Sequence, residues 1–206
     1  MKYKIDTIIF DLGGVLVDWN PEYVYKKIFK GDMKKVKWFL NHVCTYEWNL
    51  QQDAGRTIEE AVKIKVSEYP EYEDLIQLYY NQWHEMFSGP IQKNVNLFKK
   101  FKTAGFYNVY ALTNWSAQKW PKALELFPFL NDFDGVVVSG QEKTIKPNPK
   151  IYSIIINRFN LTPEKTLFID DNLHNIEAAN AFNFNTIHFK NTTQLQNEIA
   201  LFGIKI

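Results

Sequence analysis

Four short polar segments, far apart in the sequence, carry side chains that suit one reaction. Asp11 follows the apolar run Ile8-Ile9-Phe10 and precedes a pair of glycines, and the later segments are Thr113-Asn114, Lys146-Pro147 and Asp170-Asp171. In this order they supply a carboxylate, a hydroxyl, a cation and two adjacent carboxylates. Together these groups can transfer a phosphoryl group, because that reaction is catalysed mainly by positioning and by neutralising charge on oxygen.

Taken one at a time, the segments also have purely structural interpretations. Asp11 could end a strand or cap a turn, Thr113-Asn114 could form a turn, and Lys146 could be an ordinary loop lysine. The pair Asp170-Asp171 could cap a following helix, since acidic residues are favoured at helix N-termini. Two adjacent carboxylates are harder to explain in this way, because a cation relieves their repulsion most readily.

Five apolar runs rich in β-branched and aromatic residues predict the strands that must position these groups. The runs lack polar alternation, as expected of strands covered on both faces. Helical patterns accompany them; one starts at Asn148-Pro149 and another ends at Gly105. We therefore expect an α/β fold with a Rossmann-like, doubly wound parallel sheet of about five strands, at residues 7–10, 109–112, 135–138, 166–169 and 186–189.

The expected sheet also explains how distant segments can meet. Asp11, Thr113 and Asp170 each fall at the end of one of these runs. In open α/β sheets the ligand site lies beyond the carboxyl ends of the strands. We therefore expect these three side chains to converge at one edge of the sheet.

The stretch from residue 18 to residue 89 departs from this alternation and shows only helical patterns. One pattern starts at Asn20-Pro21, and the others cover residues 33–49, 57–68 and 71–87. Four helices are too many for one crossover between two strands. We therefore expect an inserted α-helical bundle, a cap domain of residues 18–89 that returns through Ser88-Gly89-Pro90, and a core domain of residues 1–17 and 90–206.

Composition argues against several classes of protein. The 206 residues carry a net charge of +1 and the basic residues are scattered, so neither a nucleic-acid partner nor a membrane surface is expected. The start of the chain shows no signal peptide, no segment has the apolar length of a spanning helix, and the lone Cys44 excludes a disulfide framework. We expect a soluble cytoplasmic protein, and its oligomeric state is not readable from the sequence.

The joint pattern resembles the haloacid dehalogenase superfamily. Asp11-Leu12-Gly13-Gly14-Val15 is similar to its first motif, Thr113-Asn114 to the second, Lys146-Pro147 to the third and Asp170-Asp171 to the fourth. The likeness covers nearly the whole chain, since the helical insert resembles the small α-helical cap of that family. Each motif alone is weak, but four in order, three of them at expected strand ends, are specific.

This resemblance implies a phosphatase that acts on a small phosphorylated metabolite. Asp11 would be the nucleophile and would form an aspartyl phosphate. Thr113 and the backbone of Asn114 would hold phosphoryl oxygens, and Lys146 would offset their charge.

The resemblance also implies a magnesium ion as cofactor. The Asp11 carboxylate, the Gly13 carbonyl and Asp171 would bind it, with Asp170 bound directly or through one water. Oxygen ligands and retained waters suit Mg²⁺. Asn175 occupies a place where the family often has another acid, and it would lie outside the ligand set.

One position departs from the pattern of most phosphatases in the family. They carry a second aspartate two residues after the nucleophile, which serves as general acid and then as base, and here Gly13 stands in that place. The Asp-Leu-Gly-Gly-Val start resembles a subgroup of sugar-phosphate phosphatases, the α-glucose-1-phosphate type. The group that handles the proton is left open, and Asp18 is the first to examine.

Substrate contacts are less well defined by the resemblance. Asp18, near the expected cap hinge, could reach the mouth of the site or could cap a helix. Arg56 lies in a cap turn that the family often uses to sense the substrate, and an exposed surface role fits it equally. Trp115 could wall the pocket or pack beneath the cap. The substrate itself is not readable, although a sugar phosphate fits the subgroup.

Two alternative functions remain at this stage. The 2-haloacid dehalogenases share the fold and the aspartate nucleophile, but they attack carbon, need no metal and typically lack the paired acids of the fourth motif. Asp170-Asp171 therefore favours phosphate. A non-catalytic phosphate-binding protein is suggested only by Gly13, and the retention of Asp11 and Lys146 argues against it.

Overall fold

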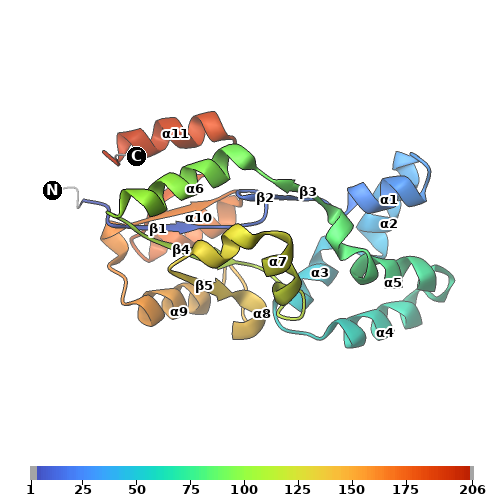
Figure 1. Cartoon of the computed structure of the whole chain (residues 1–206). Helices are drawn as coiled ribbons and strands as arrows, with labels where there is room; N and C mark the ends of the chain where they lie inside the picture. Colours follow the sequence, from blue (N-terminus) through green and yellow to red (C-terminus); the bar gives the residue numbers. More distant parts are fainter. Residues whose placement is uncertain (1–3, 205–206) are drawn as a thin grey trace.

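The computed structural model describes residues 4–204 and is built around a five-stranded parallel sheet (Figure 1). Each of the five predicted runs is confirmed as a strand, with bounds that differ by at most one residue. Residues 1–3 and 205–206 of the expected core domain, and part of the start on which the signal-peptide expectation rests, lie outside the described residues. In spatial order the strands are β5 (Gly135–Val138), β4 (Asn108–Thr113), β1 (Thr7–Phe10), β6 (Thr166–Asp170) and β7 (Asn185–His188).

The strand order creates a switch point at β1. From β1 the chain passes to β4 and β5 on one side, and then returns to β6 and β7 on the other. In register, Phe10 pairs with Ala111 of β4 and with Ile169 of β6. One residue later, the backbone N–H of Asp11 donates to the carbonyl of Ile169 at 2.8 Å. The predicted nucleophile is therefore fixed at the carboxyl edge of the central strand, where ligands bind in such sheets.

Both faces of the sheet are covered by helices, which explains the absence of polar alternation. Within β1, Ile8 and Phe10 belong to one hydrophobic cluster and Ile9 belongs to the other, and all three are fully buried. Figure 1 shows α6 and α11 on one face and α9 on the other. The first cluster includes residues of α6 (Gln92–Ala104), α7 (Trp120–Leu126) and α11 (Thr192–Leu201), and the second includes residues of α9 (Pro149–Phe159) and α10 (Leu173–Ala181).

The predicted helix boundaries in this part of the chain are confirmed by their caps. The side chain of Asn148 accepts from the backbone N–H of Lys150 at 2.9 Å at the start of α9. Gly105 ends α6 with φ of +69°, a conformation that costs glycine little. Among the helices of residues 4–204, none is both long enough and apolar enough to cross a bilayer.

The insert is helical, as expected, but two of its predicted helices are wrong in extent. The single helix expected over residues 33–49 is broken, because the hydroxyl oxygen of Thr45 accepts from the backbone N–H of Trp48 and starts a new helix. The pattern over 71–87 contains α5 and two short 3₁₀ turns, and its last residue begins a strand. The helices are α1 (Glu22–Ile28), α2 (Met33–His42), α3 (Tyr46–Asp53), α4 (Ile58–Glu68) and α5 (Glu73–Asn81), with turns η1 (Pro70–Tyr72) and η2 (Trp83–Met86).

Two short strands join the insert to the rest of the chain, which corrects the expectation that residues 18–89 hold none. β2 (Val17–Trp19) and β3 (Phe87–Pro90) pair in antiparallel fashion, with Asp18 opposite Gly89. They are only three and four residues long, so they leave little periodicity in the sequence. Asp18, where the insert begins, and Ser88-Gly89-Pro90, where it returns, therefore lie in two strands that pair with each other.

The insert also touches the core at a second place, away from the ribbon of β2 and β3. The backbone N–H of Ile58 donates to the side chain of Gln118 at 2.6 Å, and Lys119 Nζ donates to the carbonyl of Tyr80 at 2.9 Å. The hydroxyl of Ser139, in α8 (Ser139–Glu142), donates to the carbonyl of Asp53 at 2.6 Å. These contacts hold the insert against the loop that follows β4 and the short helix that follows β5.

Candidate active site

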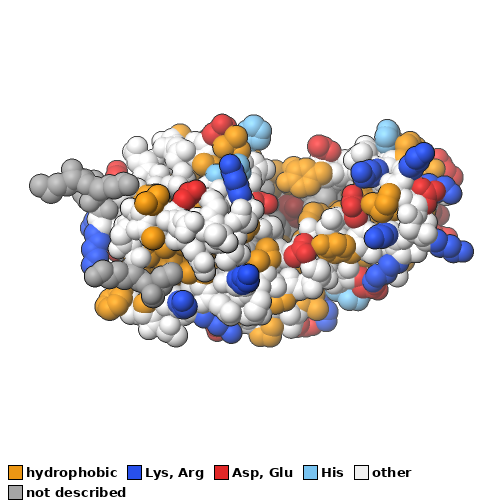
Figure 2. All heavy atoms as spheres, turned by 90° about the horizontal axis from the view of Figure 1, so that it is seen from above, with side chains coloured by type: hydrophobic (Ala, Val, Ile, Leu, Met, Phe, Trp, Pro, Cys, Tyr) orange, Lys and Arg blue, Asp and Glu red, His pale blue; other side chains and the backbone are white. Residues whose placement is uncertain are grey.

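A cavity of about 630 Å³ lies between the carboxyl edge of the sheet and the insert. In the space-filling view from above, the surface is hollowed between the two parts, with hydrophobic side chains beside the hollow (Figure 2). Residues of the core and of the insert share the lining. The core contributes Asp11, Gly13, Gly14, Asn114, Trp115, Lys146, Asp171 and His188, among others, and the insert contributes Trp19, Tyr46, Asn49, Leu50, Asp53, Tyr80, Trp83 and Phe87.

Three charged side chains meet at the core wall, two from the ends of β1 and β6 and one from the loop between α8 and α9. Lys146 Nζ lies 2.9 Å from Asp11 Oδ1 and 2.7 Å from Asp170 Oδ2. The lysine side chain is fully buried and bridges the two carboxylates. The backbone N–H of Leu12 also donates to Asp11 Oδ1 at 2.7 Å, which fixes the rotamer of the carboxylate. Of the three side chains expected to converge, Asp11 and Asp170 are joined through Lys146, while Thr113 is absent from this network.

Asp170 is held by donors on both of its oxygens. Oδ1 accepts from the backbone N–H of Asn172 at 2.8 Å and from Asn175 Nδ2 at 3.0 Å. Oδ2 accepts from Lys146 Nζ at 2.7 Å and from Asn175 Nδ2 at 3.1 Å. Since a carboxylate offers about four lone-pair sites, this set leaves Asp170 little capacity for a further partner. The amide of Asn175 thus orients Asp170, a role that the sequence did not define.

Two hydrogen bonds from the side chain of Asn114 fix the backbone of Lys146. The side-chain amide of Asn114 donates to the carbonyl of Lys146 at 3.0 Å, and its oxygen accepts from the backbone N–H of Lys146 at 2.8 Å. This pair of hydrogen bonds ties the loop after β4 to the loop that carries the lysine. The second and third sequence motifs are therefore one structural unit.

Asp11, Asp170 and Asp171 form a cluster that can hold a metal ion. Each offers an oxygen, and the three oxygens lie within 4.8 Å of one another. Gly14 makes room for the cluster, because it has φ of +74° and because a Cβ atom there would collide with the Asp171 carboxylate. Any side chain at this position would therefore be both strained and blocked.

The electrostatics of the cluster are unbalanced toward negative charge. Burial raises the pKa of Asp11 to about 8; Lys146 opposes this effect, while Asp170 and Asp171 add to it. The pKa of Asp171 is likewise raised, first by burial and then by Asp170. Burial alone would lower the pKa of Lys146, but the attraction of Asp11 and Asp170 outweighs it and raises that pKa. Three carboxylates face one ammonium, and a cation among them would favour their ionised forms.

The structure brings some of the other expected residues to the cavity and not the rest. Trp115 lines it and is 6% exposed. Thr113 lies at the end of β4, and its buried hydroxyl has no hydrogen-bond partner among residues 4–204. Asp18 and Arg56 do not belong to the lining, because their side chains are held elsewhere. Asp18 accepts from the hydroxyls of Ser88 and Tyr23 in the ribbon region, and Arg56 Nε donates to Gln52 at 2.8 Å.

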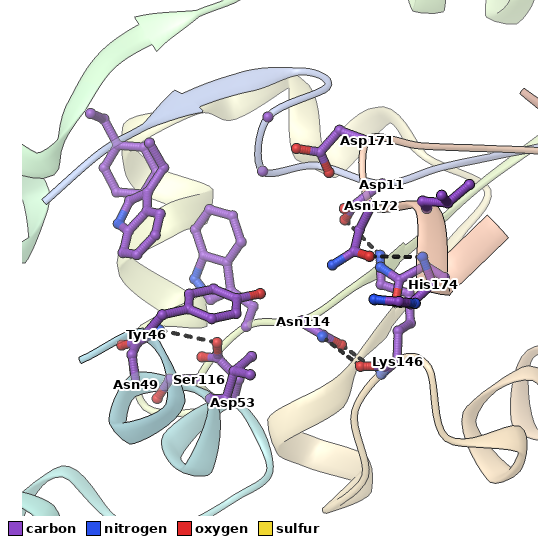
Figure 3. A pocket seen from close by; sticks show the side chains of 18 of the residues that line it. Asp11, Tyr46, Asn49, Asp53, Asn114, Ser116, Lys146, Asp171, Asn172 and His174 are labelled. Carbon is purple, nitrogen blue, oxygen red and sulfur yellow. Dashed lines mark hydrogen bonds and ion pairs between the residues drawn. The ribbon is translucent and has the colours of Figure 1, made fainter. Parts of the chain in front are cut away.

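The insert wall contains residues that the sequence did not single out. Asp53 is 9% exposed, lies at the end of α3, and points into the cavity together with Tyr46 and Asn49 (Figure 3). Tyr46, Asn49 and Asp53 occupy positions i, i+3 and i+7 of α3, so they share one face. That spacing was a usable signal, but the predicted helix over 33–49 ran through the break at Thr45 and hid the true start of α3.

A comparison of the sequence with known families agrees with this geometry. Residues 8–189 match the profile of the haloacid dehalogenase-like hydrolases, and the match includes all four motifs. The chain belongs to the haloacid dehalogenase-like hydrolase family. The resemblance inferred from the motifs is thereby confirmed for the family, and the architecture of sheet and helical insert agrees with it.

Individual relatives carry more specific names. The chain is 25% identical over 192 residues to the phosphorylated carbohydrates phosphatase of Thermotoga maritima. This alignment covers 89% of this chain and 84% of that protein. A HAD family enzyme of Bacteroides thetaiotaomicron, solved in complex with magnesium and inorganic phosphate, has a TM-score of 0.68 and 25% identity over 90% of this chain and 94% of that one. The (S)-2-haloacid dehalogenase 1 of Pseudomonas sp. is 26% identical over 60% of this chain and 53% of that protein.

Proposed function

We propose that this hydrolase is a magnesium-dependent phosphatase that cleaves a small phosphorylated metabolite through an aspartyl phosphate on Asp11. The observation that carries the proposal is the meeting of Lys146 with the carboxylates of Asp11, Asp170 and Asp171 at the carboxyl edge of β1 and β6. The Asp11 carboxylate faces the cavity, is held by Leu12 and Lys146, and has one oxygen free to attack phosphorus. Attack forms the bond from Asp11 to phosphorus and breaks the bond from phosphorus to the ester oxygen.

The residues present fit a magnesium ion. The oxygen cluster of Asp11, Asp170 and Asp171 has the hard ligands that Mg²⁺ prefers, and its excess of negative charge suits a divalent cation. Because donors already occupy both oxygens of Asp170, we propose that Asp11, Asp171 and the Gly13 carbonyl bind the ion, with Asp170 acting through a water. When bound, Mg²⁺ would offset charge on the phosphoryl oxygens and orient the ester.

The phosphoryl group would be received by side chains from the second and third motifs. Lys146 is buried, keeps its charge because of Asp11 and Asp170, and lines the cavity. Thr113 has a buried hydroxyl without a partner among the described residues, as expected of a group that awaits a small local shift or a ligand. We assign the backbone of Asn114 to the same oxygens, since its side chain already holds Lys146.

A sugar or polyol phosphate is the substrate class that we propose. The insert wall combines aromatic rings with the polar groups of Asn49, Asp53 and Tyr80, a mixture that suits a small organic group bearing hydroxyls. The likeness to a phosphorylated carbohydrates phosphatase supports this class. Trp115 would form part of the wall, where it stacks on Phe87 with ring centroids 5.7 Å apart.

Two properties of the site favour phosphate over a haloacid. The cluster of three carboxylates would repel the carboxylate of a haloacid unless a cation bridged them, whereas a metal ion and Lys146 together would attract a phosphate dianion. The buried lysine is shared between Asp11 and Asp170, so its charge serves the metal motif as well as the nucleophile. The likeness to a haloacid dehalogenase therefore reflects the shared fold and nucleophile.

The test is hydrolysis of an aryl phosphate and of a panel of sugar and polyol phosphates, with and without Mg²⁺. We expect phosphate release that stops in excess chelator and returns when Mg²⁺ is added. Asp171→Ala should reduce the rate by about 10²-fold or more, since it removes a proposed ligand. Dehalogenation of a 2-haloacid at full rate in chelator would reject the proposal, as would the absence of any phosphate release.

A further inference from the structure

The position that usually bears the acid in this family is empty space in this chain. Gly13 lines the cavity, and a Cβ atom built there would meet nothing within 4 Å. A phosphatase that acts on alkyl esters still needs a proton for the departing oxygen, since an alkoxide is a poor leaving group. Another donor must therefore supply it, and among the described residues three carboxylic acids line the cavity: Asp11, Asp53 and Asp171.

Asp53 differs from the other two because it stands on the insert. In Figure 3 it lies across the cavity from Asp11, Asp171 and Lys146. In phosphoryl transfer the attacking and leaving oxygens are roughly in line through phosphorus. Since Asp11 attacks from the sheet side, the ester oxygen departs on the side that faces the insert. Asp53 belongs to that wall.

The hydrogen bonds of the Asp53 carboxyl come from donors. Asn49 Nδ2 donates to Oδ2 at 3.2 Å, and the backbone N–H of Ser116 also donates to the carboxyl. Neither partner can accept a proton from Asp53. A proton on this carboxyl therefore finds its acceptor in the cavity, and the two donors hold the group in place without consuming that proton.

Other proton-bearing groups in the lining are less suited to this task. His188 Nε2 lies 3.0 Å from the carbonyl of Asp171 and donates to it. His174 has a side chain that is 79% exposed, and its Nδ1 lies 3.4 Å from the carboxylate of Glu177. Lys146 is committed to two carboxylates, which raise its pKa. The phenol of Tyr80 donates to Asn49 Oδ1 at 3.0 Å and accepts from Gln52, and burial raises its pKa.

We propose that Asp53 is the general acid of this enzyme, supplied by the insert in place of the aspartate that Gly13 replaces. As the Asp11 oxygen bonds to phosphorus and the ester bond breaks, the proton passes from Asp53 to the ester oxygen, which leaves as an alcohol. Asp53, now ionised, then takes a proton from the water that attacks the aspartyl phosphate, which releases phosphate and restores Asp11. This assignment rests on the proposed phosphatase function.

The surroundings of Asp53 support its protonation near neutral pH. Burial raises the pKa of Asp53 to about 7, and the hydrogen bond from Ser116 opposes that effect only in part. The titratable groups that face it are the phenols of Tyr46 on α3 and of Tyr79 and Tyr80 on α5, whose pKa values burial raises, so they stay neutral. Within residues 4–204 Asp53 forms no ion pair, and the nearby Arg56 is held by Gln52.

The experiment compares Asp53→Asn with the wild type on two kinds of ester at saturating Mg²⁺. For an alkyl phosphate, kcat/KM should fall by about 10²-fold or more, the usual contribution of a positioned acid. For 4-nitrophenyl phosphate the loss should be much smaller, because nitrophenolate departs without a proton. The alkaline decline of kcat/KM above about pH 7 on the alkyl ester should disappear in the variant.

A second-site rescue separates proton donation from a packing defect. Gly13→Asp places an acid at the usual position, where the structure has room. In the Asp53→Asn background it should recover the alkyl-ester rate by about tenfold or more, while a damaged insert would not be repaired from the core. Asp18→Asn is the matched control, since Asp18 is bound to Tyr23 and Ser88 outside the cavity and should leave the dependence on the leaving group unchanged.

The possible outcomes are distinct. Equal losses of kcat/KM on both esters in Asp53→Asn, or a rise in KM alone without a change in leaving-group dependence, would overturn the assignment and make Asp53 a binding or structural residue. Failure of Gly13→Asp to rescue would also count against it. In each of these cases the phosphatase function still stands if the wild type releases phosphate from 4-nitrophenyl phosphate. If the wild type releases no phosphate from any ester, both the phosphatase function and the role of Asp53 are overturned.

Discussion

The two walls of the cavity are built in opposite ways. The core wall holds Asp11, Lys146 and Asp170 in a network of ion pairs and hydrogen bonds, and its two carboxylates come from strand ends fixed by the sheet. The insert wall is largely aromatic and contains one carboxyl among its described lining residues, Asp53. The core wall therefore determines where charge develops, and the insert wall determines what surrounds the organic group that leaves.

Asp11 and Asp53 show how neighbours divide one residue type between two tasks. Burial raises the pKa of both, to about 8 and about 7. Asp11, however, has Lys146 at 2.9 Å and two carboxylates nearby, so a bound cation would restore its ionised, nucleophilic form. Asp53 has only neutral donors, so it can keep its proton. Carboxyls whose surroundings separate their roles in this way are typical of acid and nucleophile pairs.

The largest effect should follow replacement of the nucleophile. Asp11→Asn keeps the shape of the side chain but removes the attacking oxygen, so turnover should fall by about 10⁴-fold or more. The fold should remain, because Asn can still accept from Leu12 and because the change removes one buried negative charge. Phosphate release and thermal unfolding of the same preparation would check this. Rates near those of the wild type would contradict the covalent mechanism and the assignment of the nucleophile to the core wall.

A smaller effect should come from the amide that orients Asp170. Asn175→Leu deletes the donor to both Asp170 oxygens while preserving the side-chain volume approximately. The Mg²⁺ concentration for half-maximal activity should rise by about 10- to 100-fold, as is usual when a partner of a metal-site carboxylate is lost. Activity titrations with Mg²⁺ would measure it, with unfolding in chelator as the control for stability. An unchanged Mg²⁺ requirement would mean that Asp170 does not act on the metal.

The core wall could be predicted from the sequence because its parts lie at the ends of local patterns. Each strand is a short apolar run, and three of the four motifs begin where a run stops, so burial and chemistry mark the same boundary. The hydrogen bonds of Asn114 and Asn175 could not be predicted in the same way. They depend on which oxygen faces which donor after the loops have packed, and amide side chains carry no periodic signal.

Most of the insert wall could not be predicted from the sequence, for a related reason. Asn49 and Gln52 on α3 both hydrogen-bond the Tyr80 phenol on α5, about thirty residues away, and no local pattern links them. The break at Thr45 set the face that α3 turns to the cavity, and treating residues 33–49 as one helix lost that register. The two strands of the ribbon were missed because three or four residues do not establish a period of two.

The smallest expected effect concerns Arg56, for which the sequence left substrate sensing and an exposed surface role equally open. Its Nε is held by Gln52, and the residue does not line the cavity, so Arg56→Ala should change kcat/KM by less than about threefold. The change should be equal for a sugar phosphate and for 4-nitrophenyl phosphate. Asn49→Ala is the matched comparison, because Asn49 lines the cavity and donates to Asp53, and it should affect alkyl esters more than aryl esters. A loss of kcat/KM in Arg56→Ala that is confined to sugar phosphates would instead show that Arg56 contacts the substrate during turnover.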